Sequence, residues 1–245
     1  MRTTLEVTAV NPAGEQPATS PMRTILLLCG VASSFLYVAM NVLAARRYEG
    51  YSLISHTISE LSAIGAPSRS LWVSLGLVWN LMMMAFGAGV WGSGGRHRSL
   101  RVVGVLLVAF GAIGFVWPPM HQRGQGFTLT DTMHIVVSMV AVLLMLLAMV
   151  IGSVALGRAF RLYSFFSILL FVVFGILIGM DGPRVAANLP TPWAGLTERI
   201  NTGVFLLWLV VLALALLRGK GMEGQAGTGP LSARSPTPSR DSVTV

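Results

Sequence analysis

The run MHIVVSMVAVLLMLLAMVIGSV at Met133–Val154 contains one histidine and no other ionisable residue. At 1.5 Å per residue, an α-helix of this length exceeds the ~30 Å thickness of a bilayer's hydrocarbon core. Lipid offers no hydrogen-bond partner to backbone N–H and C=O groups, so these groups must pair within the run. The stretch therefore predicts a transmembrane helix.

Five further apolar runs of comparable composition occur in the chain. They are Thr24–Ala45, Leu71–Trp91, Leu100–Trp117, Tyr163–Met180 and Ile200–Leu217. Only 11% of the 245 residues are charged, against about 25% in soluble domains. We predict an all-α polytopic membrane protein, with a six-transmembrane-helix bundle over residues 23–218. The polar segments 1–22 and 219–245 are predicted to be disordered cytoplasmic tails.

The net charge of +8 has a topological explanation. The basic residues are scattered over short loops without a stripe or cluster, which argues against a nucleic-acid partner. With the N-terminus inside, the inner segments hold eleven Lys and Arg residues and the outer segments hold six. The positive-inside rule then predicts a multi-pass protein of the plasma membrane with both termini cytoplasmic.

The first outer loop contains the patterned stretch YSLISHTISELSAIGAP at Tyr51–Pro67. Its apolar residues recur at helical spacing, which predicts a short amphipathic helix. They are Ile54, Ile58, Leu61 and Ile64. His56 and Glu60 are four residues apart and so share a helix face, as a base with its orienting group or two metal ligands would. Alternatively, Thr57-Ile-Ser-Glu60 is a capping box, in which Glu60 binds backbone donors.

Asp131 and His134 form a second pair of catalytic candidates. The segment TLTDTMH leads into the fourth apolar run, and the i, i+3 spacing places both side chains on one helix face. Asp131 is also well placed as an N-cap. We expect His134 to face the bundle interior or a wet cavity, because an ionisable residue in a span is costly against lipid.

The stretch Ser-His-Thr-Ile-Ser-Glu-Leu-Ser at 55–62 and the Asp-x-x-His pattern that opens the fourth run carry a family resemblance. Together with the six runs, they resemble the prokaryotic membrane family catalogued as Domain of Unknown Function 998. The resemblance covers Arg23–Leu217. It implies a fold type and no activity.

The residue types bear on two further chemistries, a metal site and a serine hydrolase. His121, with the candidates above and Asp181, supplies the ligand types of a zinc-like divalent site, but the chain has no compact motif such as H-E-x-x-H, so the metal stays unknown. A serine hydrolase lacks support, because there is no G-x-S-x-G motif. Moreover, Ser55 or Ser59 beside His56 does not make a triad by adjacency alone.

Three outer arginines are candidates for binding an anionic group such as a lipid phosphate. They are Arg123, Arg184 and Arg199. The alternative is local pairing with the carboxylates of Asp181 and Glu198.

Two functions stay open at this point. The first is an outward-facing polar pocket that binds a lipid headgroup, an amphiphile or a partner protein. The second is a membrane-embedded hydrolase, metal-dependent or acid–base, that acts on a lipid-like substrate at the outer face. The expected partners are membrane lipids. A second copy of the chain could pack through the GxxxG of Gly175 and Gly179, but close packing within one bundle is the favoured explanation of that motif.

Overall fold

A computed structural model of the chain describes residues 21–223, so most of the predicted tails, 1–22 and 219–245, lies outside the described part. The tail residues that it does describe, 21–22 and 219–223, are helical. The described residues contain six α-helices long and apolar enough to cross a membrane, which confirms the predicted six-span bundle. The helices are α1 (Pro21–Arg46), α2 (Arg69–Ser93), α3 (Arg98–Ile113), α4 (Leu129–Ser153), α5 (Arg158–Ala186) and α6 (Ala194–Glu223). Two short 3₁₀ helices, η1 (Ile58–Ser62) and η2 (Gly114–Val116), lie between them.

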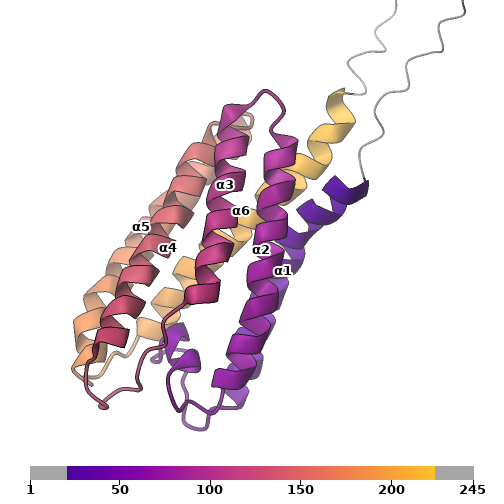
Figure 1. Cartoon of the computed structure of the whole chain (residues 1–245). Coiled ribbons are helices and arrows are strands. Elements are labelled where there is room, and N and C mark those ends of the chain that lie inside the picture. Colours follow the sequence, from indigo (N-terminus) through magenta and orange to yellow (C-terminus); the bar gives the residue numbers. More distant parts are fainter. Residues whose placement is uncertain (1–20, 224–245) are drawn as a thin grey trace, which may run out of the picture.

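Each helix packs against the one before it in the chain, and α6 returns to contact α1. The described ends of α1 and α6 lie together at one end of the bundle (Figure 1). The opposite end carries η1 and the connections α1–α2, α3–α4 and α5–α6. We call these connections, residues 47–68, 117–128 and 187–193, the polar cap. The topology therefore gathers three segments that are far apart in the sequence at one end.

Glycines allow α2 and α3 to pack closely. A Cβ atom on Gly104 would lie 2.7 Å from the Gly87 carbonyl oxygen and 2.6 Å from the Trp91 amide nitrogen. Small residues matter here because lipid tails are as apolar as the helix surfaces, so association depends on close van der Waals packing. Gly179 of the predicted GxxxG motif has no neighbour within 4 Å of such a Cβ, and Gly175 approaches only Asn201 of α6.

Polar side chains inside the bundle bond between helices. The fully buried indole of Trp208 in α6 donates to Ser164 Oγ of α5 at 3.0 Å. Ser34 of α1 donates to the Leu206 carbonyl of α6 at 3.2 Å. These bonds leave fewer polar groups unpaired in the apolar interior, where an unpaired group is costly.

The helix in the first connection is shorter than the sequence pattern predicts. Only Ile58–Ser62 is helical, and it is a 3₁₀ helix. Ile58 and Leu61 of the predicted stripe are buried, whereas Ile54 and Ile64 are exposed. The reason is a contact with α6. The Ile54 carbonyl accepts a hydrogen bond from the Leu196 amide of α6 at 2.9 Å, and this bond holds the residues before η1 against α6 as an irregular turn.

Candidate functional site

The side chain of Glu60 is the centre of the polar cap. Its Oε2 accepts the Thr57 amide at 2.6 Å, as the capping-box interpretation predicts. Arg123 binds the same carboxylate through Nε at 2.5 Å and Nη2 at 3.0 Å. The guanidinium also donates to Thr191 Oγ1 at 2.8 Å and to the Ser55 carbonyl at 3.2 Å. The partly buried Glu60–Arg123 pair, together with the Arg123–Thr191 bond, therefore joins all three connections of the cap.

Asp131 fastens the α3–α4 connection to the start of α4. Its Oδ1 accepts the His121 amide at 2.7 Å, and its Oδ2 accepts the Thr128 amide at 2.9 Å. The His121 ring nitrogen Nδ1 lies 3.0 Å from Oδ2. The prediction that Asp131 is the N-cap is wrong by one turn: Thr128 is the N-cap and Asp131 is the third helical residue of a capping box. Both oxygens of this carboxylate are engaged in local structure.

His134 makes contacts of a different kind. Its Nδ1 lies 2.7 Å from the Pro118 carbonyl oxygen, and its Nε2 lies 3.1 Å from Ser59 Oγ. A carbonyl oxygen only accepts, so in the neutral imidazole the proton is on Nδ1 and Ser59 donates to Nε2. The Trp117 ring packs edge-on against the imidazole at a centroid distance of 5.6 Å. His134 is 5% exposed, in agreement with the prediction that it faces inward.

Arg199 of α6 is engaged by the turn that precedes η1. Its Nη1 donates to the carbonyls of Leu53 at 2.9 Å and His56 at 3.0 Å. Its Nη2 lies 2.6 Å from the hydroxyl of Tyr51, which in turn donates to the Thr57 carbonyl at 2.7 Å. Burial raises the pKa of Tyr51, so the phenol keeps its proton. The guanidinium positions this turn on α6.

His56 and Glu198 complete the cap. The Nδ1 of His56 accepts the Ser52 amide at 3.0 Å, and the ring stacks on Tyr51. His56 and Glu60 therefore have separate partners, although the sequence spacing suggested a pair. Glu198 accepts the Ile58 amide at 2.5 Å, next to the Thr57 amide that Glu60 binds.

The candidate histidines have different partners. His56 binds a backbone amide, His121 an aspartate, and His134 a serine and a carbonyl. Among residues 21–223, the His, Cys, Asp and Glu side chains form no group of three that could hold a metal ion.

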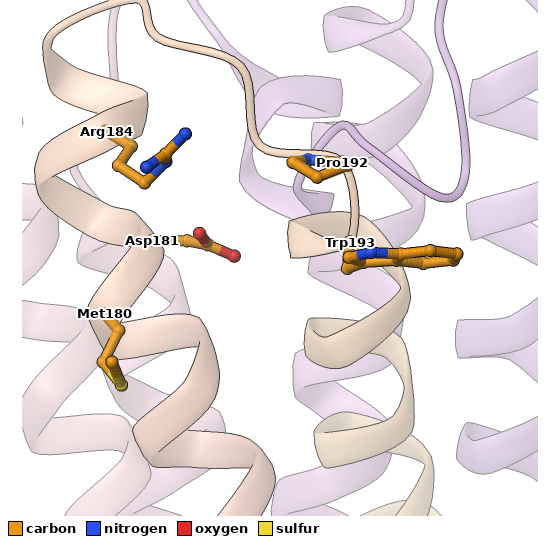
Figure 2. Close-up of a pocket in the computed structure, with 5 residues that line it drawn as sticks. All are labelled: Met180, Asp181, Arg184, Pro192 and Trp193. Carbon is orange, nitrogen blue, oxygen red and sulfur yellow. The ribbon is translucent and has the colours of Figure 1, made fainter.

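A hollow with a volume of about 460 Å³ lies between the ends of α5 and α6 nearest the cap. It is lined by Met180, Asp181, Arg184, Pro192 and Trp193. Asp181 and Arg184 point from α5 towards the start of α6, while the Trp193 ring extends away from α5 (Figure 2). Arg184 donates to the Pro190 carbonyl through Nε and Nη2, and its Nη1 has no partner among the described residues. No partner for the Asp181 carboxylate occurs within the described part of the chain.

Several residues of this region were not singled out as functional candidates from the sequence. Tyr51 and Thr191 become important only because remote arginines reach them. Ser59 lies near His56 in the sequence, but it bonds to His134, 75 residues away. The one sequence signal was the His-Thr-Ile-Ser-Glu stretch itself, which does not identify the partner.

Comparison with known proteins supports the resemblance found in the sequence. A family model described as "Protein of unknown function (DUF998)" matches residues 31–215. No curated protein and no solved structure matches the chain.

Proposed function

The chain belongs to the DUF998 family of proteins of unknown function, and for this multi-pass membrane protein we propose the binding of a phospholipid headgroup that carries both a phosphate and a free amine. The proposed site is the hollow between α5 and α6. The observation that carries the proposal is the Asp181 carboxylate, which has no partner among residues 21–223. It lies one helical turn from Arg184, whose guanidinium keeps a free N–H edge within the same range.

The other two arginines are less suitable. Arg123 is bound by Glu60, Thr191 and Ser55, and Arg199 is bound by backbone carbonyls and Tyr51. To bind a phosphate, either side chain would first have to break these bonds. Arg184 can bind a phosphate through Nη1 without breaking either of its bonds to the Pro190 carbonyl. The geometry of a guanidinium also suits phosphate oxygens.

The chemistry of the hollow favours a zwitterion over a simple anion. A phosphate alone would pair with Arg184 but would be repelled by Asp181. A primary ammonium group a few atoms from the phosphate satisfies the carboxylate as well, as in a phosphoethanolamine headgroup. Met180 and Trp193, which are 69% and 60% exposed, provide an apolar and an aromatic surface of the kind found at membrane interfaces.

The proposed location is the outer leaflet. The excess of Lys and Arg in the segments at the other end of the bundle, counted above, supports this orientation through the positive-inside rule.

The test is lipid binding to the purified full-length protein, measured by native mass spectrometry from detergent. Phosphatidylethanolamine, phosphatidylglycerol and phosphatidylcholine are compared at equal concentration. We expect Arg184→Gln to weaken binding of all three lipids by roughly three- to tenfold, the size of one partly exposed charge-assisted bond. Asp181→Asn is expected to weaken only phosphatidylethanolamine.

Arg158→Gln is the matched control, because Arg158 is an exposed arginine at the far end of the same helix. Equal binding of the three lipids to the unmodified protein, or equal effects of Arg158→Gln and Arg184→Gln, would refute the proposal.

A further inference from the structure

We propose that Ser59 and His134 form a nucleophile–base pair that hydrolyses acyl esters of amphiphilic molecules. This activity goes beyond headgroup binding and rests on different residues. Its basis is the hydrogen-bonded chain from Ser59 Oγ to His134 Nε2 at 3.1 Å and from His134 Nδ1 to the Pro118 carbonyl at 2.7 Å.

This hydrogen-bonded chain supplies a nucleophile, a base and a group that orients the base, as nucleophilic catalysis by serine requires. A serine hydroxyl is a weak nucleophile until a base accepts its proton, and His134 Nε2 is within hydrogen-bond reach of that proton. The base must itself be held in the correct tautomer by a second acceptor. Here the Pro118 carbonyl takes that orienting role, in which hydrolases more often use a carboxylate.

The bonding of Ser59 differs from that of the other serine hydroxyls in residues 21–223. Those that act as donors mostly bond to a carbonyl oxygen three or four residues earlier in their own helix or turn, as Ser62, Ser138 and Ser167 do. Such bonds satisfy a polar group locally. Within this described range, Ser59 alone donates its hydroxyl to an imidazole nitrogen, and that nitrogen lies on another element.

Both members of the pair are fixed by their surroundings. Ser59 lies in η1, whose first amide, that of Ile58, is bound by Glu198, while Glu60 binds the amide of the N-cap residue Thr57. His134 is held by the Pro118 carbonyl and by the edge-on contact with Trp117. Catalytic groups depend on such support, because a small misplacement costs much of the rate.

The position of the pair indicates the substrate class. His134 is buried, whereas Ser59 is partly exposed. Ser59 belongs to the polar cap, and His134 belongs to α4. Close in the chain to Pro118 and His134, apolar side chains are exposed: Val116 at the end of η2 is 70% exposed and Leu129 at the start of α4 is 74% exposed. A bilayer has the same profile where its polar headgroups meet the hydrocarbon, which is where the ester carbonyls of lipids lie. We infer an acyl ester of an amphiphile.

The reaction balances with water as the second substrate. Ser59 Oγ attacks the ester carbonyl carbon as its proton passes to His134 Nε2. The bond from carbonyl carbon to alcohol oxygen then breaks, and the departing alcohol takes the proton from Nε2. Water attacks the acyl-Ser59 ester in the same way, which releases the carboxylic acid and returns the proton to Ser59. The other ring proton stays on Nδ1 throughout and donates to the Pro118 carbonyl oxygen.

The experiment uses the purified full-length protein in detergent micelles. A fluorophosphonate that carries an alkyl chain reacts covalently with activated serines, and peptide mass spectrometry locates the adduct. Hydrolysis of p-nitrophenyl esters with 4 to 16 acyl carbons is followed in parallel. We expect an adduct on Ser59 and hydrolysis that increases with chain length.

Substitutions then separate catalysis from structure. Ser59→Ala should abolish the adduct and lower hydrolysis by about a thousandfold or more, and His134→Gln should do nearly the same. Ser62→Ala on the same 3₁₀ helix and His56→Gln in the same cap are the matched controls, and both should keep the activity. Arg184→Gln should also be labelled normally, so the proposed headgroup site and this site can fail separately.

The labelling of the unmodified protein is informative even if a variant does not fold. An absence of both adduct and hydrolysis in the unmodified protein would overturn the proposal. An adduct on a different serine, or hydrolysis that survives in Ser59→Ala, would overturn it as well.

Discussion

At the scale of single residues, Arg123 connects all three segments of the polar cap, a role that no sequence motif indicates. Its guanidinium binds a buried glutamate, a threonine from the α5–α6 connection and a carbonyl from the α1–α2 connection. From the sequence, Arg123 is a predicted contact for an external anion. In the structure the anion is Glu60, which is 5% exposed and would be costly to leave unpaired.

Replacement of Arg123 should therefore destabilise the cap. We expect Arg123→Gln to lower the free energy of unfolding by about 3–5 kcal/mol, because Glu60 would remain buried without its partner. The double variant Glu60→Gln/Arg123→Gln should lose less than the sum of the two single variants. Thermal unfolding in detergent measures both effects.

Arg47→Gln is the control for this prediction, because Arg47 is an exposed arginine of the same cap. If Arg47→Gln and Arg123→Gln lowered the melting temperature equally, the role assigned to the ion pair would be wrong.

At the scale of elements, the glycines of α2 and α3 set the distance between these helices. The sequence pattern predicts a close helix contact at Gly175 and Gly179. In the structure the close contact is at Gly104, which lies against the backbone of α2, whereas Gly179 faces open space.

Alanine at Gly104 and alanine at Gly179 should have different effects on the stability of the protein. Gly104→Ala places a methyl group against backbone atoms of α2, and such overpacking costs about 1–3 kcal/mol. Gly179→Ala meets no atom, so it should be neutral or slightly stabilising through helix propensity. Melting temperatures in detergent test the pair.

Gly179→Ala also tests the predicted oligomer contact. Size-exclusion chromatography with light scattering compares the oligomeric state of this variant with that of the unmodified protein. A change of state would support an interface between copies at Gly175 and Gly179.

The first connection shows how one element depends on another. Its sequence has the period of a helix, yet the residues before η1 are tied to α6 through the Ile54 carbonyl and Arg199. Gly195 makes the approach close, because a Cβ there would collide with the carbonyl oxygens of His56 and Leu53. The contacts with α6 therefore prevent the longer helix that the sequence periodicity predicts.

At the scale of the whole molecule, six spans place the described ends of α1 and α6 on one side and the polar cap on the other. The charge distribution predicts that the cap is outside the cell. Both proposed sites lie at the cap end, so their substrate and ligand would come from the outer leaflet.

Cysteine labelling in intact cells tests this orientation. Cys29 is the single cysteine, so Cys29→Ala provides a background without thiols. In that background we expect Gln125→Cys in the cap to react with a membrane-impermeant maleimide. His97→Cys in the α2–α3 connection should react only after permeabilisation, and both positions are exposed. The opposite pattern would invert the proposed topology.

The six spans, the helical class and the family resemblance were readable from the chain, because an apolar run of about 20 residues in lipid has no alternative to a helix. The Thr57–Glu60 capping box was readable for a similar reason: its partners are three residues apart. Three features were not readable: the pairing of Ser59 with His134, the pairing of Glu60 with Arg123, and the lack of a partner for Asp181 among the described residues. They depend on how connections from distant parts of the chain meet at one end of the bundle. The two pairs join residues that are 75 and 63 positions apart, and over such a separation no local sequence pattern specifies which residues come into contact.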